Sequence, residues 1–359
     1  LCVGGFIASN QSLTFVMREL VTRIGRNTFL VLALIIPVLA GMGMNFGIVI
    51  GAMAAQIAIF LTTYWGFVGI SGFLLTVLLA TPMAIFFGFL VGKLFNKIKG
   101  SEMIGGLVLG YFADGFYQLL FLFIFGGIIK INSTTLMVPT GIGVKNTIDL
   151  KDTVKYALDS VSMLTIVEVG FFVVAALVVI STILKVVQKQ AVNYKKTGMI
   201  LVVAAVIYGL SFVPFVEAFL SQDKLILLTA LEIGCVVVAV WNILRLIVQK
   251  FILKKEYNLK KTIVNLILVV IVYGLTYIPA VYEATVATTV PVMTFLCIGG
   301  LCVFNNLLLR TKLGQNMRTV GQSRVVANAA GINVDRTRII AMILSTVLAS
   351  WGQLIYLQN

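Results

Sequence analysis

Long apolar stretches, separated by short basic segments, run through most of the chain. The stretches Phe67 to Val91 and Ile200 to Phe219 each reach the length of about 20 residues that a membrane-spanning helix needs. Backbone groups in a bilayer have to be satisfied within their own segment, so helices are expected. The pattern predicts an all-α fold, a polytopic transmembrane helical bundle with about nine spans. We expect them at 28–61, 66–92, 102–129, 156–187, 198–220, 225–249, 262–285, 291–309 and 338–357.

The first apolar segment, Thr28 to Leu61, is too long for one ordinary span. Its middle is interrupted by polar and small residues, namely Gly41, Gly43, Asn45, Gly47 and Gly51. Glycine weakens helix interiors, and broken helices often line transport pathways. A long tilted helix whose glycines allow close packing explains the pattern equally well.

An internal repeat with a period of about 65 residues is visible between the middle and the last third of the chain. The segment Leu164-Thr-Ile-Val-Glu-Val-Gly170 aligns with Leu228-Thr-Ala-Leu-Glu-Ile-Gly234 and more weakly with Met293-Thr-Phe-Leu-Cys-Ile-Gly299. Between these copies, Tyr208-Gly-Leu210 and Pro214 match Tyr273-Gly-Leu275 and Pro279. The repeat therefore predicts duplicated helical hairpins in the same orientation. We expect them to enlarge the bundle, with a direct role in substrate binding as the alternative.

Composition supports the membrane assignment and charge gives the orientation. Hydrophobic residues make up 60% of the chain and charged residues 11%, against about 25% in soluble domains. The net charge of +14 does not indicate nucleic-acid binding, because the basic residues cluster between apolar runs. With a cytoplasmic N-terminus, all but five of the 27 Lys and Arg residues face the cytoplasm, the exceptions being Lys130, Lys145, Lys151, Lys155 and Lys224.

These features give a provisional domain organisation. Residues 1–27 are expected to form a cytoplasmic N-terminal interfacial segment, and residues 28–359 a transmembrane domain. Within that domain we expect an external loop at 130–155, repeated helical hairpins at 160–309 and a cytoplasmic segment at 310–337.

Several kinds of chemistry are excluded. The chain has no histidine, so proton relays, metal sites and hydrolytic triads that need histidine cannot form. Its four cysteines lack zinc-binding spacing. The segment from Gly88 to Leu94 has one residue too few between its glycines for a phosphate-binding loop, and Leu94 stands where Ser or Thr is needed. We therefore expect no catalytic site, no metal and no cofactor in this chain.

Polar residues inside spans are functional candidates because they are costly in hydrocarbon. Asp114 lies near the middle of the predicted 102–129 span, with Tyr117 and Gln118 close by. With Asn45 in the broken segment, these residues are speculative substrate-pathway positions. A structural role for Asp114 is an equal alternative.

The longest predicted internal segment, Arg310 to Thr337, contains signals for a short helix. Ser323 suits an N-cap, Val325, Val326, Ala329 and Ala330 form a helical stripe, and Gly331 suits the position after the helix. Asn333 or Asp335 can then cap the next span. A rigid helix here could transmit force from a cytoplasmic partner, or it could lie on lipid headgroups.

The stretch Met317 to Arg338 resembles the cytoplasmic coupling motif of ABC importer permeases that carry simple sugars, nucleosides or branched-chain amino acids. The similarity continues into Ala341 to Gly352. Two shorter segments, Gly41 to Asn45 and Lys99 to Ile104, are similar in style, the second to the nucleoside branch. The motif positions that the resemblance assigns to ATPase coupling are Arg318, Gly321, Ala327, Ala330, Gly331, Ile332, Asn333 and Arg336.

The resemblance implies a non-enzymatic permease subunit in the bacterial cytoplasmic membrane. On this basis residues 28–359 are expected to be its transmembrane permease domain and residues 310–337 its cytoplasmic coupling segment. It implies a second permease subunit, identical or different, cytoplasmic ABC ATPase subunits that bind ATP and Mg, and an extracytoplasmic substrate-binding protein, with no nucleic acid. A nucleoside or simple sugar is the expected substrate, with a branched-chain amino acid as the alternative. The extra hairpins at about 160–290 depart from the family topology. Rival hypotheses are a secondary transporter that uses an ion gradient through Asp114 and a non-transporting membrane scaffold.

Overall fold

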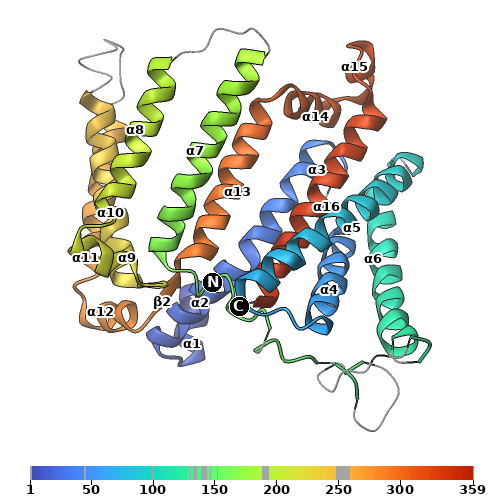
Figure 1. The fold of residues 1–359 in the computed structure, drawn as a ribbon, viewed down its shortest axis with the longest axis horizontal. Coiled ribbons are helices and arrows are strands. Elements are labelled where there is room, and N and C mark those ends of the chain that lie inside the picture. The colour runs from blue at the N-terminus through green and yellow to red at the C-terminus, as the bar shows by residue number, and fades with distance from the viewer. Residues whose placement is uncertain are drawn as a thin grey trace. The chain divides into compact units, whose positions relative to one another are not determined.

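The computed structural model describes the chain except residues 1, 44–45, 99, 126, 130, 132–135, 139–143, 146, 152, 188–193, 248–258 and 359. The chain is mostly helical and divides into two compact units, described here one at a time (Figure 1). The hairpin unit comprises Leu1–Arg23 and Val161–Met293, and the core unit comprises Ile24–Ser160 and Thr294–Asn359.

Six helical segments of the described chain are long and apolar enough to cross a membrane. They are Leu13–Leu39, Gly69–Lys97, Glu102–Ile124, Met163–Ile183, Val292–Arg310 and Val334–Gln358. A bent pair, Thr262–Leu275 and Pro279–Val286, brings the number to seven if it forms one span. The structure thus supports a polytopic helical membrane protein, whereas the figure of about nine spans stays a prediction.

Three helices form the centre of the core unit: α4 (Ile48–Tyr64), α5 (Gly69–Lys97) and α16 (Val334–Gln358). A Cβ atom added to Gly88 of α5 would lie only 2.8 Å from the Cα atom of Ile343 in α16. Such close backbone approach is typical of membrane helices with small residues at their interface. The buried small residues on α5 recur at every fourth position, at Ala80, Ala84, Gly88 and Gly92. The glycines that resemble a phosphate-binding loop are therefore helix-packing residues.

The predicted break in the first apolar segment is confirmed. Helix α2 (Leu13–Ala33) is followed by the short α3 (Ile35–Leu39), and α4 starts only at Ile48. Gly41 and Gly43 have φ values of +71° and +70°, which residues with a Cβ rarely adopt. One long tilted helix is therefore wrong. Helix α2 runs through residue 27, and the interfacial role of residues 1–27 stays a prediction.

The third predicted span, 102–129, is shorter in the structure. Helix α6 (Glu102–Leu119) continues into a π-helical turn, η1 (Leu120–Ile124). The ring of Phe121 in this turn packs on those of Phe60 and Phe125, with centroid separations of 5.0 and 5.3 Å. Aromatic packing thus fixes the end of α6 against α4.

The span predicted to start at residue 156 starts at Met163 instead, with α7 (Met163–Val187). The preceding residues form turns that pack on the end of α16. The Tyr156 N–H donates to the Gln358 carbonyl oxygen at 2.6 Å, and the Leu158 N–H donates to the Gln358 side chain at 3.2 Å. Asp159 is buried and accepts a 2.5 Å hydrogen bond from Thr294, in α13 (Val292–Arg310). The two bonds to Gln358 satisfy backbone N–H groups that a longer helix would have satisfied internally.

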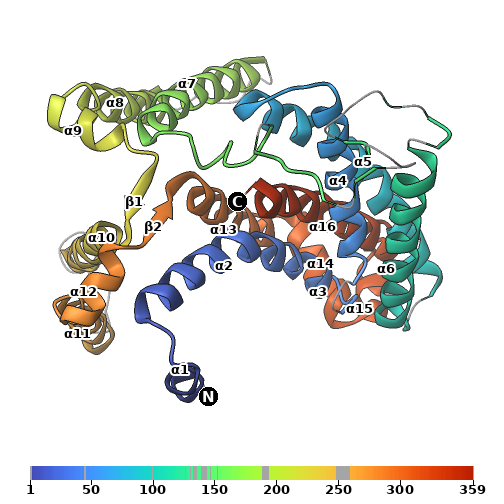
Figure 2. The same cartoon turned by 90° about the horizontal axis from the view of Figure 1, so that it is seen from below.

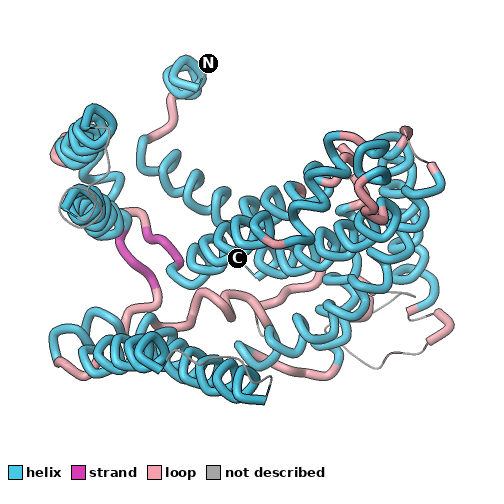
Figure 3. The backbone as a smooth tube through the Cα atoms, turned by 90° about the horizontal axis from the view of Figure 1, so that it is seen from above, coloured by secondary structure: helices cyan, strands magenta, loops and turns pink. Residues whose placement is uncertain are grey.

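The hairpin unit contains α1 (Cys2–Ser9), the first residues of α2, and two helical hairpins that follow one another in sequence. The first hairpin is α7, α8 (Tyr194–Leu210) and α9 (Pro214–Leu220), and the second is α10 (Leu227–Ile247), α11 (Leu259–Leu275) and α12 (Pro279–Val286). Strands β1 (Lys224–Ile226) and β2 (Thr289–Pro291) pair antiparallel, with Leu225 opposite Val290 (Figures 2 and 3). The all-α prediction is right apart from this short ladder.

Both hairpins bend at matching positions. The predicted spans 198–220 and 262–285 run through these positions without a bend. Val213 and Ile278 have nearly identical extended conformations, with φ −71° and −67° and the same ψ of 125°. Each precedes a proline, which disfavours helical geometry in the residue before it. The second bend measures 85°. The matching bends agree with a duplication, although the repeat itself stays a prediction.

Candidate functional site

The predicted coupling segment folds as two helices in the core unit. Helix α14 (Lys312–Gln322) starts after Thr311, whose hydroxyl accepts from the Gly314 N–H. Helix α15 (Arg324–Ala329) starts after Ser323, whose hydroxyl accepts from the Val326 N–H at 3.3 Å. The N-cap at Ser323 is therefore confirmed, because the side chain replaces a missing helical acceptor.

A Schellman motif ends α15. Gly331 has a φ of +75°, its N–H donates to the Asn328 carbonyl oxygen, and the Ile332 N–H donates to that of Ala327, both at 3.0 Å. The apolar contact that accompanies this motif is present as well, since Ile332 packs against a buried cluster of Val320, Ala327 and Val334. Local sequence thus determines a rigid turn between α15 and α16.

The predicted apolar stripe on α15 faces outward. Val325 and Val326 are 79% and 59% exposed, and Ala327 is the residue of this helix that is buried. The predicted coupling residues Arg318, Ala330 and Arg336 are also exposed. Asn333 accepts from the Arg336 N–H at 2.9 Å and so caps α16.

Gly321 holds the coupling segment against the break between α3 and α4. A Cβ atom at Gly41 would lie 2.8 Å from the Gly321 Cα atom, and one at Gly321 would collide with the carbonyl oxygen of Leu39. The two backbones therefore touch directly, which only glycine allows at this separation.

A second attachment is ionic. Arg324 at the start of α15 lies 2.7 Å from Glu102 at the start of α6, and Arg338 of α16 donates to the same carboxylate oxygen. The other oxygen of Glu102 accepts from the Gly100 N–H at 2.8 Å. Asn96, near the end of α5, adds a 2.9 Å hydrogen bond to the Asp335 carbonyl oxygen. The coupling segment is thus tied to the connection between α5 and α6.

Sequence reasoning did not select Glu102, Arg324 or Arg338 as site residues. The available signal was that Glu102 and Arg338 begin two predicted spans on the same side of the membrane. An ionisable residue at such a position needs a partner, and opposite charges there can supply it. Their pairing depends on tertiary structure, since 236 positions separate them in sequence.

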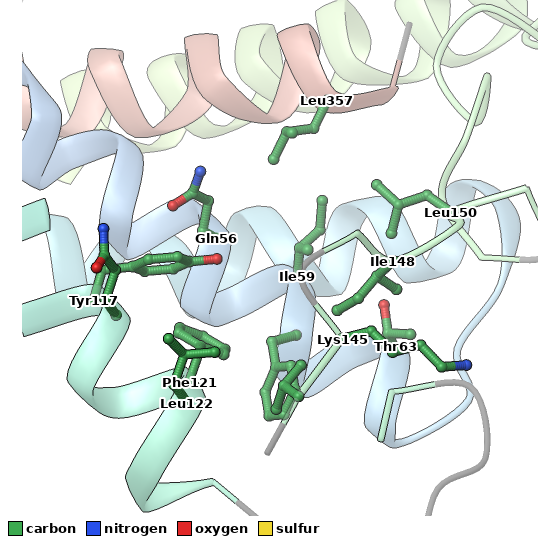
Figure 4. A pocket seen from close by; sticks show the side chains of 13 residues that line it. Gln56, Ile59, Thr63, Tyr117, Phe121, Leu122, Lys145, Ile148, Leu150 and Leu357 are labelled. Carbon is green, nitrogen blue, oxygen red and sulfur yellow. The ribbon is translucent and has the colours of Figure 1, made fainter. Parts of the chain in front are cut away.

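A cavity of about 540 Å³ lies at the other end of the core unit. It is bounded by α4, the end of α6 with η1, residues 144–145, Ile148 and Leu150, and the end of α16 (Figure 4). Tyr117 and Gln118 line it, as the pathway prediction requires, together with Gln56 and Thr63 of α4 and Lys145. Figure 4 shows Tyr117 and Gln56 pointing into the same space.

The lining of this cavity combines aromatic faces with hydrogen-bonding groups. The Tyr117 and Phe121 rings have centroids 4.4 Å apart, and the Thr63 hydroxyl is buried without a hydrogen-bond partner among the described residues. Small-molecule sites typically have mostly apolar walls and a few orienting polar groups. Asp114 is exposed beside the cavity and accepts a 3.4 Å hydrogen bond from Gln118. Asn45 lies outside the described residues.

A comparison with protein families matches residues 169–358 to the family described as branched-chain amino acid transport system, permease component. The match covers more than half of the chain; it starts within α7 and includes the rest of the first hairpin, the second hairpin, the coupling segment and α16. It leaves out the segments at Gly41 to Asn45 and Lys99 to Ile104, whose likeness to the family stays a prediction. No curated protein and no solved structure matches the chain.

Proposed function

We propose that this chain is the membrane-spanning subunit of a bacterial ABC uptake system, because it belongs to the family described as branched-chain amino acid transport system, permease component. The apolar helices support a transport subunit that resides in the membrane. ATP and Mg are bound by separate ATPase subunits, and this chain carries no catalytic site.

The observation that carries the proposal is the construction of the coupling segment. Helix α15 presents the exposed side chains of Val325 and Val326, yet its buried side and both of its ends are fixed to the core unit. A short helix with an apolar outer face and a rigid base suits a cytoplasmic ATPase partner, because it transmits displacement without deforming. With the N-terminus in the cytoplasm, this segment faces the ATPase.

The cavity lies near the far end of α16 from the coupling segment. Arg338 and Leu357 are 19 residues apart in this helix, so about 28 Å separates the two sites. This separation supports a cavity on the outer side, to which an extracytoplasmic binding protein delivers its cargo. Switching between outward and inward access is then a two-state change driven by ATPase closure.

The cavity lining favours a small polar substrate with a planar or ring-shaped part. Tyr117 and Phe121 provide stacking faces, while Gln56, Gln118 and Thr63 provide hydrogen-bonding groups. A nucleoside or a simple sugar suits this lining best, and a branched-chain amino acid is the alternative. A second permease subunit, identical or different, completes the pathway past the exposed Asp114.

Reconstitution tests the proposal. The chain is incorporated into liposomes with the ATPase subunits and binding protein encoded beside it, and uptake of labelled nucleosides, sugars and branched-chain amino acids is measured with and without ATP. ATP-dependent uptake is expected. Uptake that persists without the ATPase and collapses with the ion gradient would instead establish a secondary transporter. A non-transporting scaffold would produce neither uptake nor a change in ATPase activity.

A further inference from the structure

The carboxylate of Glu102 connects the N-terminal turns of three helices in the core unit. Glu102 is the first residue of α6, Arg324 is the first residue of α15, and Arg338 lies in the first turns of α16. Both arginines bond to the same oxygen of Glu102. Helix α15 is therefore linked to α6 through the side chains of Arg324 and Glu102.

The two arginines differ in how firmly they are held. The Arg338 side chain is 0% exposed, and a second hydrogen bond links it to the Phe95 carbonyl oxygen at 3.4 Å. The Arg324 side chain is 34% exposed and belongs to the six-residue helix α15. Water can replace the bonds of Arg324 but not those of Arg338, so the Arg338 pair is permanent and the Arg324 pair is the adjustable one.

Helices α6 and α16, which the pair of Glu102 and Arg338 joins, also differ in how much of their surface is packed. Over an 18-residue apolar stretch, 56% of the residues are buried in α16, against 11% in the span formed by α6 and η1. Because Glu102 stays bound to Arg338 of the packed helix α16, a shift of α15 that loosens the Arg324 contact would leave α6 free to tilt about this anchor. Tyr117 lies 15 residues beyond Glu102, or about 22 Å along α6. A tilt of α6 by about 10° would shift Tyr117 by about 4 Å, which is enough to remodel the cavity.

We propose that the Arg324 to Glu102 contact is the route by which the coupling helix α15 moves α6, so that both residues are positioning residues for the cavity at Tyr117 and Gln118. The backbone contact between Gly321 and Gly41 is the fixed point on which α15 turns. This inference rests on the proposed function as an ATP-driven permease.

The test is the number of substrate molecules transported per ATP hydrolysed, measured in the reconstituted complex. Arg324→Ala removes the adjustable arm and leaves the buried pair of Glu102 and Arg338 intact. We expect the variant to assemble with its ATPase and hydrolyse ATP, with transport per ATP lowered about fivefold or more. Arg324→Lys keeps the charge and is expected to recover part of the loss. The matched control is Arg23→Ala, which breaks an exposed ion pair with Glu19 outside the coupling segment and is expected to leave the ratio unchanged.

A double-mutant cycle establishes whether Arg324 acts through Glu102. If it does, adding Arg324→Ala to Glu102→Gln lowers transport per ATP no further. If Glu102→Gln does not accumulate in the membrane, the Arg324→Ala result decides alone. A wild-type ratio in Arg324→Ala, or loss of the ATPase from that complex, would overturn the inference. Absence of ATP-dependent uptake by the wild-type complex would instead refute the proposed function.

Discussion

The contact between Gly321 and Gly41 gives the sharpest stability prediction, because two opposing effects of one methyl group can be compared. In Gly321→Ala the new Cβ atom would lie 3.1 Å from the Gly41 nitrogen and would collide with the Leu39 carbonyl oxygen. Both neighbours are backbone atoms, so neither can move away by a rotamer change. Overpacking of this kind costs about 1–3 kcal/mol.

Helix propensity acts in the other direction at this position. Gly321 lies within α14, where alanine is favoured over glycine by about 1 kcal/mol. Taking an overpacking cost near the upper end of its range, we expect a net destabilisation of about 1–2 kcal/mol. The matched control is Gly209→Ala in α8, where nothing lies within 4 Å of the added Cβ atom and only the propensity gain applies.

Thermal denaturation in detergent, followed by size-exclusion chromatography with fluorescence detection, measures both variants against the wild type. The prediction is opposite signs: Gly321→Ala melts below the wild type and Gly209→Ala at or above it. Transport per ATP is also expected to fall in Gly321→Ala, since the fixed point of α15 has moved. If Gly321→Ala is as stable as Gly209→Ala and couples normally, the close backbone contact is not part of the folded protein and the reasoning fails.

Three further predictions follow from the same contacts. Glu102→Gln leaves the fully buried Arg338 without a counter-charge and should destabilise the protein by about 3–5 kcal/mol. Combining Glu102→Leu with Arg338→Met should recover much of this stability in a thermal-denaturation assay. If the double variant recovers no stability, the two residues do not form a buried ion pair. Ala330→Arg should leave the chain inserted but abolish substrate-stimulated ATPase activity in liposomes, whereas normal stimulation would contradict a coupling role. Tyr117→Ala should lower uptake at least about tenfold with unchanged membrane abundance, while Phe112→Ala on the exposed side of α6 should retain uptake; equal effects would exclude the cavity as the pathway.

The broken first apolar segment shows what the local sequence pattern can predict and what it cannot. Glycines and a polar residue in the middle of an apolar run predicted either a break or tight packing, and the structure contains both. The chain turns at Gly41 and Gly43, while Gly51 in α4 packs against α16, where its Cβ would lie 2.8 Å from that of Ala349. Sequence alone could not assign these roles, because a glycine permits a turn and a close contact equally well.

Pro214 and Pro279 are matching positions of the repeat in the sequence. The predicted spans 198–220 and 262–285 nevertheless continue through them. Apolar composition continues across both prolines, so hydropathy alone extends the helix through them. The structure bends there because proline restricts the residue before it and lacks the N–H for a helical bond.

The sequence by itself determined that the chain is helical and resides in a membrane, since hydrocarbon allows few other ways to satisfy the backbone. It also determined the ends of the coupling helix, because the caps at Ser323 and Gly331 act on atoms within a few residues. Only the tertiary structure decided which residues anchor that helix. Glu102, Arg324 and Arg338 are brought together by the packing of helices far apart in sequence, and apolar periodicity sets the length of a span without specifying its neighbours.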